Sequence, residues 1–385
     1  MTYLTEDHLA IQESTREFAR REIEPIAQTL DLEDKQIPDE VLAKMGALGL
    51  FGVTLPEEHG GLGLDTAALC VVTEELAKAS LSVGSVIHRN STLGHILHLY
   101  GTDEQRTKYL AGMASGDIMT SSSGTEPEAG SDAANIKTTA KRTSNGYVLN
   151  GNKQWTTFAN RADLLFVYAR TSNEHKHGGI SLFMVEKPAG KFLPPNLTGT
   201  HIPTAGYHGM KSYSLALDDL EVPESALVGG VEGQGFRQLM SGYETARITF
   251  ASRCIGLAQA AYEEALAYTQ QRVQFGKTIS NFQAVRFRLA DMYTQIQAAR
   301  SMTFAAAEAF DTGKRADLEA GAVKLFAAEM AHKVAWDALY LHGGNGYAID
   351  SKVNRYWRDA GLLPIGEGTS DIQREIIARR ILGER

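Results

Sequence analysis

The chain has 385 residues, of which 43% are hydrophobic and 22% are charged, and its formal net charge is -8. An acidic chain without a basic run does not predict a nucleic-acid-binding protein, because phosphate contacts need a basic face. Its apolar stretches are too short for a membrane span, and its only cysteines, Cys70 and Cys254, exclude a disulfide framework and a cysteine-rich metal site.

The first part of the chain predicts a helical domain over residues 1–118. Its N-terminal stretch, MTYLTEDHLAIQESTREF, has early acidic residues and no hydrophobic signal core, so we expect no secretory leader and a cytoplasmic location. Apolar residues then recur at helical spacing over residues 19–30, 39–48 and 66–79. Pro25 is expected to kink the first of these helices.

The middle of the chain changes to strand-like patterns and predicts a β domain over residues 119–232. The dipeptide Asn150-Gly151 lies between two such runs and is the strongest hairpin signal in the chain. Further strand-like runs, bounded by Gly, Pro and Asn, cover residues 163–169, 179–185 and 212–222.

Long helical patterns return after residue 232 and predict a helical domain over residues 233–385. Apolar residues from Val323 to Leu341 keep helical spacing, and the pattern stops at Gly343 and Gly344. Three or four such segments favour a four-helix bundle. The expected fold class is α+β but mostly α: a helical domain, a β domain of barrel or sandwich type, and a helical bundle.

A carboxylate near the C-terminus is the strongest candidate for catalysis. Glu367 lies between Gly366 and Gly368, before a predicted helix whose start Ser370 and Gln373 mark with a capping-box spacing. A helix start offers free N–H groups to a bound carbonyl or phosphate oxygen, and a nearby carboxylate can take a proton from the same molecule. The spacing alone is more typical of a solvated glutamate that stabilises the helix dipole.

Two other segments fit either a cofactor or an ordinary structural role. The hydroxyl- and glycine-rich stretch 121–132 precedes Trp155 and Thr157, which suit a planar heteroaromatic cofactor, although the stretch also fits a flexible linker. Arg272 and Phe275 follow a long helix and suit a pyrophosphate and a purine, although a basic residue there also stabilises the helix dipole.

In this order, the segments resemble the acyl-CoA dehydrogenase family over essentially the whole chain. The matching stretches are Thr125-Glu126-Pro127, Gly130-Ser131-Asp132, Trp155 with Thr157, Arg272 with Phe275-Gly276-Lys277, Gly343-Gly344-Asn345-Gly346-Tyr347, Arg358-Asp359 and Glu367-Gly368-Thr369-Ser370. The resemblance implies an FAD-dependent enzyme that forms a double bond between the α and β carbons of an acyl thioester. It implies that Glu367 abstracts the α proton while a hydride passes from the β carbon to flavin N5. The thioester oxygen would be bound by the backbone N–H of Glu367 and a flavin ribityl hydroxyl.

The resemblance also implies which residues bind the cofactor and the substrate. The implied FAD contacts are Thr125, Ser131, Trp155 and Thr157 at the flavin, Arg272, Phe275, Gln283, Gly343 and Gly344 at the adenine and pyrophosphate half on a neighbouring subunit, and Thr369 and Asp371 at the helix start. The implied substrate contacts are Ser131, Tyr243, Glu244, Arg247, Gly366 and Gly368. FAD shared between subunits predicts a homotetramer or at least a dimer, and the expected electron acceptor is an electron-transferring flavoprotein.

Three positions discriminate among members of the family. Ala246 stands where some members carry the base, which favours Glu367. Val83 stands where an arginine binds the distal carboxylate in the glutaryl-CoA branch, although Arg89 lies six residues on, so a dicarboxylic substrate is not expected. Gly366 replaces a tyrosine found in many members. Either this makes room for a branched, cyclic or aryl acyl group, or a neighbouring side chain refills the space.

Three other functions stay open from the sequence. The thioester could be carried by a carrier protein instead of CoA, oxygen could reoxidise the flavin as in an oxidase, or the chain could bind flavin or thioester without catalysis. The last of these predicts loss of the glutamate, and Glu367 is retained.

Overall fold

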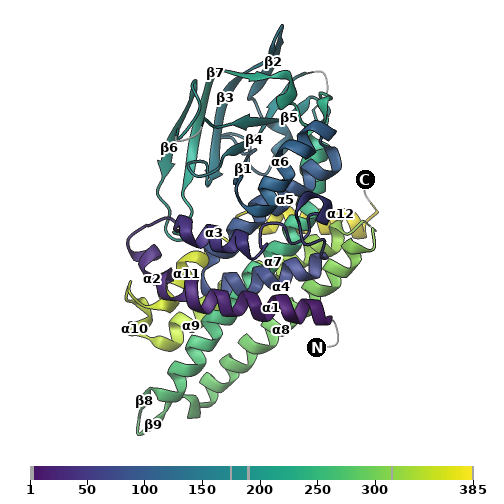
Figure 1. Ribbon diagram of the computed structural model, residues 1–385. Helices are drawn as coiled ribbons and strands as arrows, with labels where there is room; N and C mark the ends of the chain where they lie inside the picture. The colour runs from purple at the N-terminus through teal and green to yellow at the C-terminus, as the bar shows by residue number, and fades with distance from the viewer. Residues whose placement is uncertain (1–3, 174–175, 189–190, 314, 384–385) are drawn as a thin grey trace.

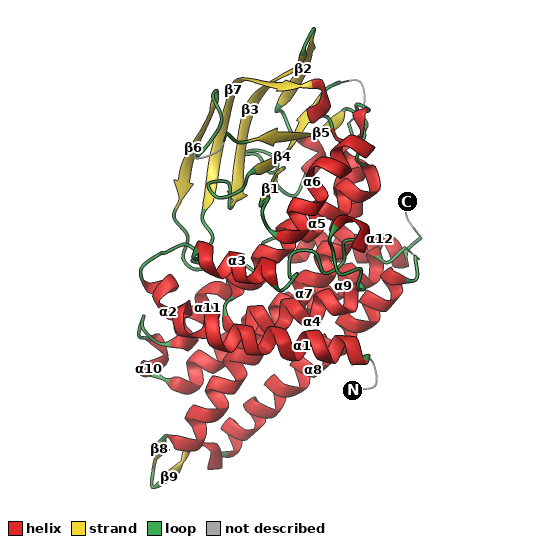
Figure 2. Ribbon diagram, in the orientation of Figure 1, coloured by secondary structure: helices red, strands yellow, loops and turns green. Residues whose placement is uncertain are grey.

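The computed structural model describes residues 4–173, 176–188, 191–313 and 315–383. The β region lies between two helical regions in the sequence, whereas in space the sheet stands at one end of the molecule and helices from both regions pack together (Figure 1 and Figure 2). The helices before the β region are α1 (Glu6–Phe18), α2 (Glu24–Leu32), α3 (Asp39–Ala47), α4 (Thr66–Ala79), α5 (Leu81–Tyr100) and α6 (Asp103–Ser115). The helices after it are α7 (Gly235–Gln271), α8 (Gln283–Asp311), α9 (Asp317–His342), α10 (Gly344–Tyr347), α11 (Lys352–Ala360) and α12 (Ser370–Ile381). The predicted order of helical, β and helical parts is confirmed.

The first helix is interrupted close to Pro25, as predicted. A π-helical turn, Ala19–Ile23, separates α1 from α2, and Pro25 lies in the first turn of α2. That place suits proline, because an N–H group there has no partner in the helix. At the other end, Thr5 caps α1 by accepting from the His8 N–H.

The β region is a curled seven-stranded sheet beside α5 and α6 (Figure 2). Its strands are β1 (Thr120–Ser123), β2 (Thr139–Thr143), β3 (Gly146–Thr157), β4 (Leu164–Arg170), β5 (Ile180–Glu186), β6 (Leu197–Ile202) and β7 (Ser212–Pro223). They pair in the order β1-β4-β2-β3-β7-β6, and β5 pairs with the other side of β4. The strand-like runs predicted at 163–169, 179–185 and 212–222 form β4, β5 and β7 and are confirmed.

The hairpin predicted at Asn150-Gly151 is wrong. Strand β3 runs through this dipeptide, and the ladder between β3 and β7 only shifts register there. Gly151 has a φ of 148°, and the Asn150 side chain bonds to Asp219 on β7, so the dipeptide forms a bulge. The turn lies at the start of β3 instead, where Gly146 follows Asn145 and β2 pairs back onto β3.

The long helix α7 is the centre of the helical core. It packs against α4, α5, α8 and α9, and α12 packs on α9. Gly256 lets α7 approach α4 closely, since a Cβ there would lie 2.4 Å from the Glu74 carbonyl oxygen. A two-stranded hairpin, β8 (Val273–Gln274) and β9 (Lys277–Thr278), links α7 to α8 at the far end of the bundle (Figure 1). Within the described ranges, none of the helices combines the length and apolar character that crossing a bilayer requires.

A buried polar cluster joins α2, α11 and the segment between β6 and β7. Asp31 accepts from Arg358 Nη1 at 2.9 Å, and His208 Nδ1 lies 2.7 Å from the Asp31 carbonyl oxygen. The other ring nitrogen of His208 lies 3.1 Å from the Thr204 carbonyl oxygen. Because both nitrogens face oxygen acceptors, the folded protein favours the protonated ring. The hydrogen bond to Asp31 is the main cause that raises the pKa of His208 to about 9.

Replacing His208 by Gln is expected to lower thermal stability more at low pH than at high pH. The pKa of His208 is higher in the folded state than its ordinary value of 6.5. Its contribution is therefore complete below about pH 6.5 and is lost as pH rises through about 9. The contribution should be on the order of 2 kcal/mol at low pH. Unfolding midpoints of wild type and H208Q, compared across this pH window, measure this contribution.

The exposed His332 on α9 provides a matched control. We expect H332Q to have the same midpoint as wild type at every pH. A gap between wild type and H208Q that widens as pH rises would contradict the assignment of a protonated His208.

Candidate active site

Glu367 lies in a turn that directly precedes α12. Its backbone has a φ of 54°, a left-handed conformation that is rare for a residue with a side chain. Strain of this kind persists where the surrounding structure enforces it, and it occurs often at functional sites. The capping box predicted from Ser370 and Gln373 is wrong by one residue, because Thr369 is the N-cap and accepts from the Ile372 N–H at 3.3 Å.

A buried lysine fixes this turn. Lys324 on α9 is fully buried, and its Nζ donates to the carbonyl oxygens of Leu363 at 3.1 Å and Gly368 at 2.7 Å. The Gln373 side chain also donates to the Gly368 carbonyl, at 3.2 Å. The lysine thus bridges the two ends of the turn that carries Glu367, which explains how the left-handed backbone is maintained.

The Glu367 carboxylate has two buried partners from other helices. Arg253 Nη2, on α7, donates to Glu367 Oε1 at 2.6 Å. His88 Nε2, on α5, lies 3.2 Å from Oε2, and His88 Nδ1 lies 3.1 Å from Thr249 Oγ1. Oε2 is buried and has no aligned hydrogen bond within the described part of the chain, so it is the oxygen that can take a proton without giving up a donor. The side chain keeps 22% of its surface exposed, so it is not sealed from the solvent.

The electrostatics of the site keep Glu367 ionised. Burial raises its pKa, but Arg253 and His88 outweigh burial and hold the pKa well below the usual 4.5. Burial also lowers the pKa of His88 despite the neighbouring carboxylate. Glu367 is therefore ready to accept a proton at neutral pH, although it is a weak base while Arg253 binds it.

The turn also presents free backbone donors. In the described part of the chain, the N–H groups of Glu367 and Gly368 donate to no protein acceptor. They stand at the N-terminal end of α12, where the helix dipole favours negative charge. A carbonyl oxygen bound there would have N–H donors beside the Glu367 carboxylate, an arrangement suited to removing a proton from the same molecule.

The residues expected at the flavin lie around the end of β3. A shift in the ladder between Lys153 and Thr156 leaves Trp155 outside the pairing with β7, with a φ of 58° and half of its surface exposed. Thr157 Oγ1 is buried 2.8 Å from Ser212 Oγ. The Thr125 carbonyl oxygen accepts from the Gln154 N–H at 2.8 Å, which brings the segment that carries Thr125 to the same place.

This surface fits the isoalloxazine ring of FAD. A flat, half-exposed indole beside hydroxyl groups is a suitable wall for a planar heteroaromatic ring. A Cβ at Gly130 would meet no atom within 4 Å, and the neighbouring Ser131 is exposed, so the loop leaves space. The structure brings Thr125, Trp155 and Thr157 together at the end of the sheet.

The residues expected at the adenine and pyrophosphate half form a second, separate group. Phe275, at the β8–β9 turn, is 93% exposed, and Arg272 and Gln283 are exposed on either side of this hairpin. Tyr268, in the last turns of α7 before this hairpin, stacks on His342 with ring centroids 4.1 Å apart. His342 directly precedes Gly343 and Gly344, so this contact links the two glycines to the end of α7. A Cβ at either glycine would meet no atom within 4 Å, which leaves a cradle open to a ligand.

The residues expected to contact the substrate lie on α7 and on the turn before α12. Arg247 is buried, lies over the Tyr243 ring at 5.4 Å, and leaves its Nε–H without a partner in the described chain. Glu244, which follows Tyr243 on α7, is half-buried. A Cβ at Gly366 would only touch Leu362 at 3.6 Å, so local packing does not require a glycine at this position.

Asp371 does not face the base. Its side chain is 93% exposed and pairs with Arg374 at 3.3 Å. A role at the cofactor would therefore involve a ligand that reaches the surface of α12.

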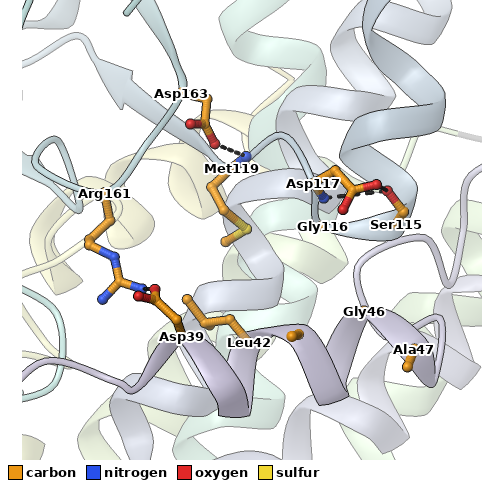
Figure 3. Close-up of a pocket in the computed structure, with 11 residues that line it drawn as sticks. Asp39, Leu42, Gly46, Ala47, Ser115, Gly116, Asp117, Met119, Arg161 and Asp163 are labelled. Atoms are coloured by element: carbon orange, nitrogen blue, oxygen red, sulfur yellow. Dashed lines mark hydrogen bonds and ion pairs between the residues drawn. The ribbon is translucent and has the colours of Figure 1, made fainter. Parts of the chain in front are cut away.

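A cavity of about 490 Å³ lies away from these residues, between α3, the segment after α6 and the segment before β4 (Figure 3). Its polar groups pair with one another: Arg161 with Asp39, and the Met119 N–H with Asp163 at 2.9 Å. None of the predicted site residues lines it. We assign no catalytic role to this cavity.

Three residues of the site were missed from the sequence: His88, Arg253 and Lys324. Each lies in the middle of a long helix, where periodicity predicts core residues. The available signal was weak, since a charged residue at a core position of a helix is rare unless it is paired. Their partner, Glu367, is more than forty residues away from each of them in the sequence.

Family models match the chain along most of its length. The acyl-CoA dehydrogenase N-terminal domain matches residues 5–117, the middle domain residues 121–220 and the C-terminal domain residues 233–382. The (2S)-methylsuccinyl-CoA dehydrogenase of Cereibacter sphaeroides is 41% identical over 384 residues, which cover 98% of this chain and 70% of the relative. The chain belongs to the acyl-CoA dehydrogenase family. The resemblance found in the sequence is thereby confirmed.

Other members of the acyl-CoA dehydrogenase family agree with this assignment. The 3-(aryl)acrylate reductase of Clostridium sporogenes is 39% identical over 99% of this chain and 100% of its own length. A chain from the structure of the electron transferring flavoprotein of Acidaminococcus fermentans has a TM-score of 0.94 and 36% identity, and the match covers 98% of each chain. The protein is an FAD-dependent oxidoreductase that acts on CH–CH bonds, with acyl-CoA as its class of substrate.

Replacing Lys324 by Met is expected to slow flavin reduction by about 10- to 100-fold while FAD stays bound. The substitution leaves the Leu363 and Gly368 carbonyls without their buried donor, so the turn no longer fixes Glu367 within the narrow geometry that proton transfer requires. Stopped-flow anaerobic bleaching of the flavin by an acyl-CoA measures the rate. K333M, an exposed change on the same helix, should react like wild type. An unchanged rate in K324M would contradict the role of Lys324.

Proposed function

We propose that this protein catalyses α,β-dehydrogenation of an acyl-CoA, with Glu367 as the base. The observation that carries the proposal is the ionised Glu367 carboxylate, held in a left-handed turn beside free N–H groups. Glu367 Oε2 takes the α proton of the thioester. FAD, when bound, supplies the acceptor for the hydride that leaves the β carbon. The products are an α,β-unsaturated acyl-CoA and reduced FAD.

The backbone donors next to Glu367 have a defined part in this reaction. Removal of the α proton places negative charge on the thioester oxygen. The N–H groups of Glu367 and Gly368, at the N-terminal end of α12, are suited to bind that oxygen. Because these donors are fixed by the backbone, they stabilise the developing charge without reorganisation in the transition state.

The cofactor contacts are proposed residue by residue. Thr125, Ser131, Trp155 and Thr157 bind the flavin, Arg272, Phe275, Gln283, Gly343 and Gly344 bind the adenine and pyrophosphate half, and Thr369 and Asp371 complete the contact at α12. Thr125, Trp155 and Thr157 lie around the end of β3, whereas the second group surrounds the β8–β9 hairpin and the start of α10, and Figure 1 shows these elements away from the sheet. This separation supports FAD shared between two subunits and hence a homodimer or homotetramer.

The electron acceptor and the location follow from the same proposal. An electron-transferring flavoprotein is the proposed acceptor, supported by the similar chain from the Acidaminococcus fermentans structure. The cytoplasmic location stays a prediction from the sequence. The domain boundaries at residues 118 and 232 also stay predictions from the sequence.

The acyl group is proposed to be branched, cyclic or aryl. Gly366 directly precedes the base, and a Cβ there would make only an ordinary contact with Leu362. Since packing does not demand a glycine, the missing side chain leaves space beside the reacting carbons. The named substrates of two relatives, methylsuccinyl-CoA and arylacrylate, carry a branch or a ring close to those carbons. Ser131, Tyr243, Glu244, Arg247 and Gly368 are the proposed further substrate contacts.

Replacing Glu367 by Gln is expected to give a folded, yellow protein whose flavin is not bleached by acyl-CoA. The amide cannot take the α proton, so the reduction rate should fall by about 1000-fold or more. Anaerobic bleaching against a panel of acyl-CoAs measures the loss. E375Q, which removes an exposed carboxylate from α12, serves as the matched control. Full turnover in E367Q would remove Glu367 from the mechanism.

Replacing Gly366 by Tyr is expected to shift specificity towards straight acyl chains. The added ring would fill the space beside the α and β carbons and exclude a branch or ring there. The ratio of kcat/KM for branched or alicyclic thioesters to that for butyryl-CoA should fall by about 10-fold or more. G366A, whose added methyl group has room, should keep the wild-type ratio. A clear preference of the wild type for butyryl-CoA would show that Gly366 does not enlarge the site.

A further inference from the structure

The proposed base has a buried guanidinium as its direct partner. Arg253 is 3% exposed and donates from Nη2 to Glu367 Oε1 at 2.6 Å and from Nη1 to Ser85 Oγ at 3.1 Å. Its Nε–H is buried and has no hydrogen-bond partner in the described part of the chain. An unused buried donor costs free energy unless a ligand takes it up.

Positive charge exceeds negative charge around this pair. Lys324 is also buried, and its Nζ donates to the carbonyl oxygen of Gly368, the residue after Glu367. The charge of Glu367 acts on both Lys324 and Arg253. Arg247 adds a third cation whose field reaches Glu367, although Glu244 and Asp317 partly balance it. Arg253 pairs directly with the carboxylate, whereas Lys324 bonds to the backbone carbonyls of Leu363 and Gly368 and adds positive charge nearby without pairing with it. This excess of positive charge favours a second anion.

We propose that Arg253 binds a carboxylate on the acyl group, so that the enzyme acts on CoA monoesters of short dicarboxylic acids. A guanidinium is the side chain best matched to a carboxylate, because its donors fit both oxygens. Val83 stands where the glutaryl-CoA branch carries its arginine, and for that reason a dicarboxylic substrate was not expected from the sequence. Arg253 approaches the reacting carbons from α7 instead. The inference rests on the proposed dehydrogenation at Glu367.

The position of Arg253 limits the length of the acyl group. Glu367 has to reach the α carbon, and Arg253 already contacts Glu367 Oε1. A substrate carboxylate that shares this guanidinium therefore stands only a few bonds from the α carbon, at about 1.5 Å a bond. This fits a carboxylate attached to the β or γ carbon, as in succinyl or glutaryl thioesters. The space beside Gly366 is compatible with a branch on the same chain.

Binding of such a substrate would also change the base. Its carboxylate competes with Glu367 for the donors of Arg253 and adds a like charge nearby, and both effects favour the protonated form of Glu367. The base thus becomes stronger when the correct substrate is present. The substrate carboxylate itself is unchanged: the α proton passes to Glu367, the β hydride with its two electrons passes to FAD, and a carboxylated enoyl-CoA is formed.

Anaerobic flavin bleaching of the holoenzyme with matched thioesters tests the inference. Succinyl-CoA and glutaryl-CoA are compared with 4-methylpentanoyl-CoA and 5-methylhexanoyl-CoA, in which an isopropyl group replaces the carboxylate. The 2-methyl derivatives of succinyl-CoA and of 4-methylpentanoyl-CoA form a third pair, which tests the same difference on a branched acyl chain. We expect wild type to favour the carboxylated member of at least one pair by about 100-fold in kcat/KM, the effect of a desolvated charge pair.

Substitution of Arg253 assigns the preference to this side chain. In R253M the ratio of kcat/KM for the carboxylated thioester to that for its isopropyl counterpart should fall to near one. R253K, which keeps a positive charge, should retain part of the wild-type preference. R300Q provides the matched control, because Arg300 is another largely buried arginine, paired with Glu74 on α4. We expect R300Q to keep the wild-type ratio. Flavin absorbance and the unfolding midpoint report whether each variant is folded, and the wild-type comparison stands without any variant.

Two results would overturn the inference. Equal bleaching by both members of every pair in wild type would exclude carboxylate recognition while leaving the proposed dehydrogenase function intact. Equal slowing of both members in R253M would mean that Arg253 acts only through Glu367. If no thioester bleaches the wild-type flavin, the proposed function itself fails, which is a distinguishable outcome.

Discussion

The ion pair between Glu367 and Arg253 is the interaction on which the site depends. It joins the turn before α12 to the central helix α7 and lies in a largely buried setting, where an unpaired charge would be costly. Lys324 fixes the same turn from α9, through its bonds to the Leu363 and Gly368 carbonyls. Three helices that are distant in sequence therefore determine where one carboxylate stands. The rest of the helical core supports this arrangement.

The fold separates the tasks of the enzyme. The helical core holds Glu367 and the cations around it, whereas the end of the sheet presents Trp155 and Thr157, the proposed wall for the flavin. The register shift that turns Trp155 out of the ladder is the second irregularity in β3, after the bulge at Gly151, and it is the one to which a function is proposed. At the other end of the bundle, the exposed Phe275 and the open backbone at Gly343 leave a surface that this chain does not fill by itself. A second copy of the chain is the proposed complement.

The sequence predicted the architecture better than the site. Periodicity and turn residues located the long helices and the strands β4, β5 and β7, because each pattern is local. The Asn150-Gly151 hairpin was wrong because cross-strand bonds to Asp219 keep β3 continuous, and these bonds depend on tertiary structure. Glu367 was identifiable from its neighbours in the chain. Arg253 and Lys324 were not, because their significance comes only from helix packing that brings them to Glu367.

The pH dependence of kcat/KM tests the central claim most directly, because this ratio reports the ionisation of the free enzyme. The measurement uses flavin reduction by an acyl-CoA whose acyl group is uncharged, in wild type and in R253M. The account predicts that the acidic limb of the wild-type profile lies below the ordinary glutamate value of 4.5, since Arg253 and His88 hold the pKa of Glu367 down. In R253M this limb should move up by about one pH unit or more. Superimposable acidic limbs in the two proteins would contradict the control of Glu367 by Arg253.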